Sequence, residues 1–414
     1  MTLYSRIWPV VLALVLSGPA LAANLSDKLV INADQSDPAP RKAWSQLVAQ
    51  FRQENPDLEV SFNVFGHEAY KTAFRQWLGN APPDVVFWYA GERMQYFVQR
   101  GLLEDISDVY SPELKRDLAG SIAAVSRAGK QYGLPYSYYH WGLFYRKDLF
   151  DKAGIATPPA NWAQFMAAGK KLKAAGITPI TLGSKALWPM AAWFDYLNLR
   201  LHGIEFHQQL MAGKIAYTDP RVRATFEQWG QLIKAGFFLE NHAAYDWQEA
   251  QPFFHQGKSA MVLMGNFASP MFPPEQVAQI GFFPFPEMDA KVPHAEEAPL
   301  DSLHIPAKAV NKKAARRFLQ FVARADVQQK LNAGLLQIPA NARAKVADNR
   351  FLQAGQSLLA ASHGLSQFYD RDTDADMAQF GLKAFAEFMA HPERLDAILQ
   401  SLEARRAAIF NAGP

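Results

Sequence analysis

The chain has no cysteine among its 414 residues. This absence excludes disulfides, thiolate metal sites, cysteine nucleophiles and the lipidated cysteine that tethers many exported bacterial proteins to a membrane. The chain also lacks an excess of charge of one sign, since 42 Lys and Arg oppose 39 Asp and Glu and the two signs are interleaved. A nucleic-acid-binding protein usually has a basic stripe, so we expect no nucleic-acid partner.

Long apolar runs are nearly absent. The run from Ile7 to Leu16 is much shorter than the ~20 residues that span a bilayer. Arg6 precedes this run, Gly18-Pro19 breaks it, and Ala20-Leu21-Ala22 supplies the small residues that signal peptidase requires. We therefore expect residues 1–22 to be a cleaved signal peptide, and the mature protein to be soluble in an exported compartment, best matched by a Gram-negative periplasm.

Motifs for phosphate binding, nucleophilic catalysis and metal binding are incomplete. Gly257-Lys258-Ser259 is like the end of a phosphate-binding loop, but Pro252 stands where the first glycine is needed. His67-Glu68 begins like a zinc-protease helix without the second histidine. The alternating acids from Asp370 to Asp376 lack the glycine and final glutamate of a calcium loop. We expect no cofactor, no metal and no catalysis, although a secreted carbohydrate-active enzyme stays open because paired carboxylates leave no local motif.

Strand and helix patterns alternate between residues 28 and 89. Apolar residues with a period of two mark the strands, and a spacing of three or four marks the helices between them. This β-α-β-α-β order predicts an α/β fold with a largely parallel sheet and helices on both faces. The expected strands are 28–33, 60–64 and 84–87, and the expected helices span Trp44 to Phe51 and Tyr70 to Leu78.

Polar and aromatic residues follow each of these strands. Asp34 and Gln35 follow the first strand, Glu68 follows the second, and Trp88 and Tyr89 follow the third. Because ligands collect beyond the carboxyl ends of parallel strands, we expect these side chains to contact a ligand.

Aromatic residues are unusually frequent, at 13% of the chain. A pyranose ring presents C–H groups that stack on an aromatic face, while its hydroxyls need donors and acceptors of fixed geometry. Several aromatic residues stand where strands meet helices, among them Trp188 and Phe267. These residues indicate a carbohydrate as one class of ligand.

Tyr138 and Tyr139 suggest a different ligand, ferric iron. Two adjacent tyrosinates, together with His140 and a carboxylate such as Glu68 or Asp34, would give this hard cation suitable ligands. The residues alone leave iron binding open as an alternative to sugar binding.

Three separate segments carry a family resemblance. The first has the pattern Phe-x-x-Gly-Lys-x-Ala-Met, followed four residues later by a glycine. The second begins with Tyr-Gly-Leu-Pro, and the third is a strand that ends in tryptophan. Together they resemble the extracellular solute-binding proteins of family 1, the maltose-binding-protein-like components of carbohydrate ABC importers. The segments are Phe253–Met261 with Gly265; Tyr132–Pro135 followed by Leu143–Phe150, Ala153–Ile155, Pro158-Pro159 and Trp162; and Asp84–Trp88.

The resemblance implies a type II periplasmic-binding-protein-like fold, with two α/β lobes, a multi-segment hinge and a ligand cleft between the lobes. The N-terminal lobe would comprise residues 23–134 and 300–350, and the C-terminal lobe residues 135–299 and 351–414. Ligand would close the hinge, and inner-membrane ABC permease subunits would recognise the closed form. The protein would perform no chemistry, and we expect it to be a monomer.

The resemblance also implies which residues bind the ligand, with Trp88 as the stacking platform. Phe267 stands where maltose binders often carry tryptophan, and Glu92-Arg93 follow Trp88 with one extra residue, which argues against maltose itself. A neutral oligosaccharide and an anionic sugar derivative both stay open. The expected ligand-binding residues are Asp34, Gln35, Glu68, Trp88, Tyr89, Arg93, Tyr139, His140, Trp188, Asn266, Phe267, Asp301, His304 and Arg371.

Overall fold

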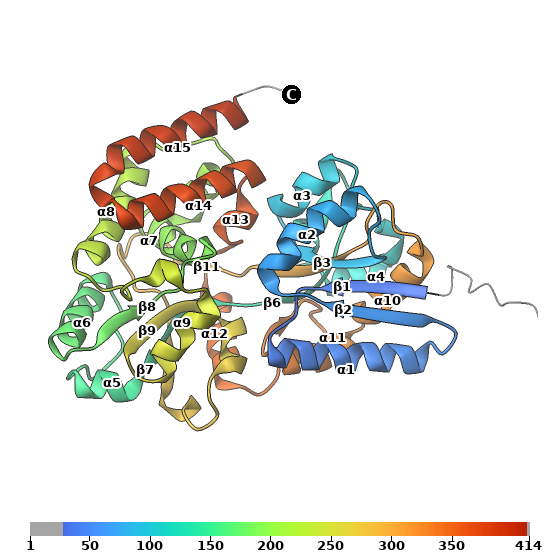
Figure 1. Cartoon of the computed structure of the whole chain (residues 1–414), viewed down its shortest axis with the longest axis horizontal. Helices are drawn as coiled ribbons and strands as arrows, with labels where there is room; N and C mark the ends of the chain where they lie inside the picture. The colour runs from blue at the N-terminus through green and yellow to red at the C-terminus, as the bar shows by residue number, and fades with distance from the viewer. Residues whose placement is uncertain (1–27, 412–414) are drawn as a thin grey trace, which may run out of the picture.

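Residues 28–411 form two α/β lobes that lie side by side in the computed structural model (Figure 1). Each lobe has its own buried apolar cluster. The first cluster draws on residues 29–136 and 300–340, and the second on residues 139–285 and 351–402. The predicted α/β class with two lobes is confirmed, since the chain has two separate apolar clusters. Neither cluster is formed from one continuous stretch of chain.

The first lobe contains a six-stranded sheet in the order β13-β6-β12-β3-β1-β2. β1, β2 and β3 are parallel, whereas β12 runs antiparallel to both β3 and β6. The strands are β1 (Lys28–Ala33), β2 (Glu59–Val64), β3 (Val85–Tyr89), β6 (Leu134–Tyr138), β12 (Leu300–His304) and β13 (Ile338–Pro339). The helices are α1 (Pro38–Glu54), α2 (His67–Gly79), α3 (Glu92–Gln99), α4 (Pro112–Asp117), α10 (Lys312–Ala323) and α11 (Ala325–Leu335).

The second lobe contains a four-stranded sheet in the order β10-β7-β9-β8. Its strands are β7 (Trp141–Arg146), β8 (Thr178–Thr181), β9 (Ser259–Gly265) and β10 (Ile280–Phe283), with β11 (Ala295–Glu297) and β14 (Gly364–Ser366) paired separately. The helices are α5 (Lys147–Lys152), α6 (Trp162–Ala174), α7 (Ala191–Met211), α8 (Pro220–Lys234), α9 (Trp247–His255), α12 (Arg350–Ala361), α13 (Tyr369–Asp372), α14 (Ala375–Ala390) and α15 (Leu395–Phe410). The short 3₁₀ helices η4 (Trp188–Met190) and η6 (Asn266–Met271) follow β8 and β9 along the chain.

Local sequence explains where the first helix begins and ends. α1 follows Asp37 and has Pro38 at its first position, where the missing N–H costs nothing. Its buried face includes Trp44 and Phe51, spaced by two helical turns. Asn55 ends the helix, and its side-chain amide donates to the Phe51 carbonyl at 2.7 Å. The start of α1 therefore leaves Asp34 and Gln35 at the carboxyl end of β1.

Two expected boundaries differ from the structure. β6 pairs with β12 and β13 in the first sheet, so the chain leaves the first lobe after Tyr138 rather than after Leu134. Trp88 and Tyr89 are the last residues of β3 rather than the residues after it. The expected signal peptide, residues 1–22, lies outside the described residues, and within residues 28–411 no helix is long and apolar enough to cross a bilayer.

His304 on β12 is fully buried in the first lobe. Its Nδ1 lies 2.7 Å from the Tyr132 carbonyl oxygen and its Nε2 lies 2.8 Å from Ser302 Oγ. This geometry fits a neutral ring that donates from Nδ1 and accepts at Nε2. Burial lowers the pKa of His304 to about 4.

We expect His304 to destabilise the protein as the pH falls. The unfolded chain binds a proton at His304 near pH 6.5, whereas the folded chain does so only near pH 4, so this stability is present above 6.5 and is lost as the pH falls toward 4. The contribution to the free energy of unfolding is about 3 kcal/mol. Denaturant unfolding at stepped pH should show a shallower pH dependence in His304→Gln than in the exposed control His391→Gln. Equal slopes in the two variants would contradict the assignment.

Candidate ligand-binding site

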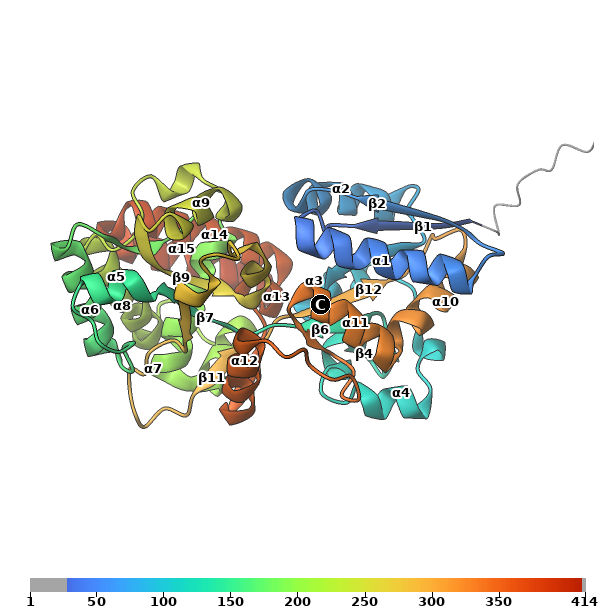
Figure 2. The ribbon, with the colours of Figure 1, turned by 90° about the horizontal axis from the view of Figure 1, so that it is seen from below.

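A cavity of about 120 Å³ lies between the two lobes. The carboxyl ends of β1 and β3 open into it from the first lobe, and η4, α9, η6 and α13 line it from the second lobe. Figure 2 shows α9 and α13 in the lobe on the left, and α1, α2 and β1 in the lobe on the right. The lining residues are Asp34, Gln35, Asp37, Pro40, His67, Lys71, Phe87, Trp88, Tyr89, Arg93, Tyr136, Asp301 and Gln337, with Tyr139, Trp141, Trp188, Trp247, Gln248, Phe267, Phe368, Asp370 and Arg371.

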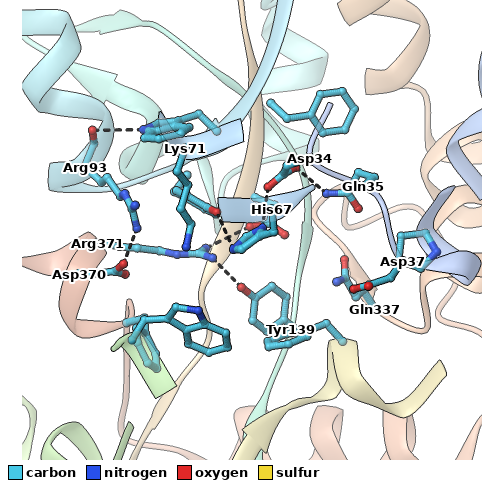
Figure 3. A pocket seen from close by; sticks show the side chains of 18 of the residues that line it. Asp34, Gln35, Asp37, His67, Lys71, Arg93, Tyr139, Gln337, Asp370 and Arg371 are labelled. Atoms are coloured by element: carbon cyan, nitrogen blue, oxygen red, sulfur yellow. Dashed lines mark hydrogen bonds and ion pairs between the residues drawn. The ribbon is translucent and has the colours of Figure 1, made fainter. Parts of the chain in front are cut away.

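The first-lobe wall carries most of the polar groups of the cavity, beside the aromatic side chains of Phe87, Trp88, Tyr89 and Tyr136. Asp34 Oδ1 accepts a hydrogen bond from Gln35 Nε2 at 2.9 Å, and Asp34 Oδ2 lies 3.1 Å from His67 Nδ1. The other ring nitrogen of His67 lies 3.3 Å from the Tyr89 hydroxyl. Burial opposes ionisation of Asp34, but the hydrogen bond and charge of His67 outweigh it, so the pKa of Asp34 is lowered. Asp34 is therefore an ionised acceptor in a chain of polar groups that reaches into the cavity (Figure 3).

The second-lobe wall is aromatic. Trp247 meets Phe267 edge to face at a centroid separation of 5.3 Å, and Trp188 lies 6.2 Å from Phe267. Trp141 stacks on Phe368 at 4.8 Å. Within the described part of the chain, the indole nitrogens of Trp141 and Trp188 have no hydrogen-bond partner.

Helix α13 carries charged side chains from the second lobe to the first. Asp370 accepts from Arg93 at the start of α3, and Arg371 Nη1 donates to Asp301 Oδ1 on β12 at 3.1 Å. Arg371 Nη2 also donates to the Tyr139 hydroxyl at 2.7 Å. The two lobes are therefore joined across the cavity by two ion pairs that arise from adjacent residues of one short helix.

The second lobe holds α13 firmly in place. The Tyr369 backbone N–H donates to Oδ2 of buried Asp195 at 2.8 Å, and the Thr373 hydroxyl donates to the Met211 carbonyl at 2.8 Å. Both partners lie on α7. A shift of the lobes relative to each other must therefore change the contacts that Asp370 and Arg371 make with the first lobe.

Most of the expected binding residues meet in this cavity. Those that line it are Asp34, Gln35, Trp88, Tyr89, Arg93, Tyr139, Trp188, Phe267, Asp301 and Arg371. Their contact with a ligand stays a prediction. Glu68, His140, Asn266 and His304 do not line the cavity, and each has a physical reason for lying elsewhere.

Glu68 and His304 miss the cavity because of strand and helix geometry. Glu68 is half exposed and accepts from Lys71 Nζ at 2.9 Å, whereas its helical neighbours His67 and Lys71 face the cavity. His304 lies an odd number of residues beyond Asp301 on β12, and successive side chains of a strand point to opposite faces. Asp301 therefore faces the cavity and His304 faces the interior of the first lobe.

His140 and Asn266 are fully buried behind the cavity at the hinge. The His140 ring packs edge to face on Phe282 at 5.0 Å and fills the space left by the missing side chain of Gly355. The Asn266 amide donates to the Leu336 carbonyl at 2.6 Å. These two side chains therefore hold the crossing segments instead of facing the cavity.

Trp88 reaches the cavity but is packed into the first lobe. Phe74 stacks on the indole at 3.8 Å with an interplanar angle of 8°, and the Arg93 guanidinium lies 5.2 Å from the ring centre. The expected role of Trp88 as the main stacking platform has little room in this arrangement. Trp188, Trp247 and Phe267 line the cavity from the second lobe and add three further aromatic rings to it.

The expectations from sequence missed several cavity residues. The sequence predicted that α2 contributes to the site through Glu68. In the structure, α2 lines the cavity with His67 and Lys71 instead. Asp370 is adjacent to the expected Arg371. Trp247 and Gln248 begin α9, which the aromatic pattern alone does not place at the cavity, and no sequence signal marks Gln337.

The iron alternative is not favoured by the geometry of the two tyrosines. Tyr138 packs against the first-lobe cluster and Tyr139 belongs to the second, so the two side chains diverge. Burial raises the pKa of both phenols, which disfavours the tyrosinate form that binds iron. Among residues 28–411, no group of three His, Asp or Glu side chains is suited to hold a metal ion.

Comparison with known proteins decides the family. The profile of the bacterial extracellular solute-binding proteins matches residues 35–329 of the chain. The protein belongs to this family. The resemblance noted in the sequence is thereby confirmed, and the exported location typical of the family agrees with the expected export.

Curated relatives are similar over much of the chain. An uncharacterized ABC transporter extracellular-binding protein of Pyrococcus horikoshii is 24% identical over 302 residues, which is 70% of this chain and 67% of that protein. A multiple sugar-binding protein of Streptococcus mutans is 21% identical over 314 residues, which is 73% of each chain.

Solved structures confirm the type II periplasmic-binding-protein-like fold. The bacterial solute receptor AcbH, described as having an exclusive preference for β-D-galactopyranose, superposes with a TM-score of 0.86 at 26% identity, over 93% of this chain and 100% of the receptor. Maltose-bound MalE3 of T. maritima superposes with a TM-score of 0.76 at 18% identity, over 92% and 99% of the two chains, and shows the fold alone.

Proposed function

We propose that the protein captures a sugar in the cavity between its lobes and delivers it in the periplasm to the inner-membrane permease subunits of an ABC importer. The observation that carries this proposal is the pairing of two unlike walls. Trp188 and Phe267 face the cavity from one lobe, and ionised Asp34 with His67 faces it from the other. A pyranose needs both an aromatic surface for its C–H groups and fixed polar groups for its hydroxyls.

Closure follows from the same arrangement. A ligand that touches both walls binds the closed form better than the open form, and its binding energy shifts the hinge equilibrium by that difference. Permease subunits would then distinguish loaded from empty protein by the relative position of the lobes.

Binding without chemistry agrees with the state of the cavity carboxylates. Asp34 is held by His67, Asp301 by Arg371, and Asp370 by Arg93. Hydrolysis of a glycoside needs one carboxyl group that delivers a proton and a second that attacks or activates water. Three of the four carboxyl groups that line the cavity are engaged in this way, while burial raises the pKa of the fourth, Asp37. The family membership supports a binding protein rather than a glycosidase.

The test is a binding screen on purified protein that has been partially unfolded and refolded to remove carried ligand. Thermal shift and calorimetry would compare neutral sugars, sugar acids, polyols and ferric citrate. A ligand at about 100 times its dissociation constant should add about 2.7 kcal/mol of stability. Binding of iron with no response to any sugar would contradict the proposal.

Trp188→Ala should identify the cavity as the binding site. Loss of this indole removes much of the aromatic wall, and we expect the affinity for the bound sugar to fall by about 2–4 kcal/mol, as for a truncated hot-spot residue. Trp162→Ala is the matched control, since Trp162 stacks on Phe165 in the same lobe and does not line the cavity. Calorimetry of both variants should show a large loss only in the first, and equal losses would place the site elsewhere.

A further inference from the structure

Charged groups are distributed unevenly along the cavity. Figure 3 shows Lys71, Arg93 and Arg371 gathered around Asp370 at one end, with Asp34, Gln35, Asp37 and Gln337 toward the other. The group of four at the first end is here called the Asp370 cluster. It combines two residues of the first lobe, on α2 and α3, with two residues of α13.

Each cation of the Asp370 cluster already has a carboxylate partner. Arg93 pairs with Asp370 itself, Arg371 pairs with Asp301 at 3.1 Å, and Lys71 pairs with Glu68 at 2.9 Å. The partner of Lys71 stands at the solvent-exposed rim, whereas Asp370 and Arg371 are buried. The positive charges inside the cavity are thus compensated before a ligand enters.

Asp370 is the carboxylate on which all three positive charges act. Burial opposes its ionisation, but Arg93, Lys71 and Arg371 together outweigh burial and lower its pKa. Asp370 therefore carries a full negative charge at neutral pH. A second anion in the same place would meet this charge at short range and would also lose its hydration.

We propose that Asp370 makes the cavity selective for uncharged sugars, because its negative charge lies among Arg93, Lys71 and Arg371 and offsets the attraction that these cations would otherwise exert on the carboxylate of a sugar acid or the phosphate of a sugar phosphate. This inference rests on the proposed sugar-binding function. Specificity of this kind comes from a repulsive group directed at the wrong ligand as well as from contacts with the right one. Arg93 and Arg371 remain able to donate to hydroxyl oxygens through N–H groups that their carboxylates do not occupy.

The experiment uses matched ligand pairs. For each neutral hexose that binds the full mature protein, calorimetry would compare its uronic acid and its 6-phosphate at the same pH and low ionic strength. We expect the neutral sugar to bind the unmodified protein about tenfold or more tightly than its acid. Asp370→Asn keeps the shape of the side chain and removes its charge, so we expect the ratio of affinities to move toward the acid by about tenfold or more.

Two further variants keep the result interpretable. Asp376→Asn makes the same change of net charge at an exposed position outside the cavity, and the ratio should stay unchanged. Lys71→Met removes one cation, so we expect the affinity for the neutral sugar to rise relative to the affinity for its acid. The double variant Asp370→Asn with Lys71→Met should return the ratio toward that of the unmodified protein. Lys71→Met also tests the proposal if Asp370→Asn does not fold.

The outcomes separate this inference from the proposed function. If an unmodified protein binds sugar acids as tightly as neutral sugars, or if Asp370→Asn leaves the ratio unchanged, the role of Asp370 is overturned while sugar binding stands. If Asp376→Asn shifts the ratio as much as Asp370→Asn, overall charge decides selectivity and the role of Asp370 is likewise overturned. If no sugar binds at all, both proposals fail.

Discussion

Replacing Arg371 with methionine is expected to lower the free energy of unfolding by about 3–5 kcal/mol and to abolish sugar binding. Arg371 donates to Asp301 Oδ1, to the Leu300 carbonyl at 3.2 Å and to the Tyr139 hydroxyl. Without the guanidinium, Asp301 is left buried without its ion-pair partner, so it must either keep an uncompensated charge or take up a proton. Burial already raises the pKa of Asp301 to about 6, even though the charge of Arg371 lowers it. Denaturant unfolding and calorimetry would measure the two effects.

The double variant Arg371→Met with Asp301→Asn distinguishes the two parts of this expectation. Replacing both partners should recover most of the lost stability, because methionine and asparagine are uncharged and neither needs an ion-pair partner when buried. It should not recover sugar binding, because the contacts of α13 with β12 and Tyr139 stay broken. Recovery of both properties would mean that Arg371 acts only through Asp301, and no recovery of stability would mean that the packing of Arg371 dominates.

Gly91→Ala is expected to prevent full closure of the lobes and to weaken sugar binding by about 10- to 100-fold. Gly91 precedes α3 with φ at 78°, and a Cβ added to it would lie 2.7 Å from the Arg371 carbonyl oxygen on α13. That distance is shorter than van der Waals contact, and the opposing atom is backbone that cannot rotate away. The first lobe and α13 would have to separate, which moves the polar wall of the cavity away from the aromatic wall.

Small-angle scattering with and without sugar would measure the loss of closure, and calorimetry would measure the loss of affinity. Gly66→Ala is the matched control. Gly66 stands at the start of α2 beside the same cavity, has φ at −63°, and has no atom within 4 Å of an added Cβ. Because alanine at a positive φ also costs about 1–2 kcal/mol, stability is measured alongside. A sugar-induced compaction equal to that of the unmodified protein would refute the role of this contact.

The sequence predicted correctly those parts of the site that depend on the local order of strands and helices. The order of strands and helices predicted a parallel sheet, and the carboxyl ends of its strands do open into the cavity, as Asp34 and Gln35 show. The rule that ligands contact residues at strand ends does not predict the direction in which a side chain points, so it selected Glu68 instead of its neighbour His67. One residue along α2 separates exposed Glu68 from the cavity residue His67, because adjacent helical residues point about 100° apart.

Other parts of the site have no local signature. Arg93 and Asp370 are 277 positions apart, and they meet only because α3 and α13 pack together from different lobes. Tyr138 and Tyr139 illustrate the reverse case, since neighbours in sequence were expected to share an ion and instead pack in separate lobes. Contacts of this kind depend on the relative placement of the lobes, which no stretch of the chain encodes by itself.

The amino-acid sequence is enough to establish the family, the α/β class, the absence of thiol chemistry and the presence of aromatic and polar residues at strand ends. These properties follow from composition and from periodicities of two and 3.6, which act over a few residues. The tertiary structure alone decided which aromatic faces are covered, as Phe74 covers Trp88, and which charges compensate one another around Asp370. Burial and charge pairing depend on distances between residues that are far apart in the chain, so they are fixed only when the lobes have folded and met.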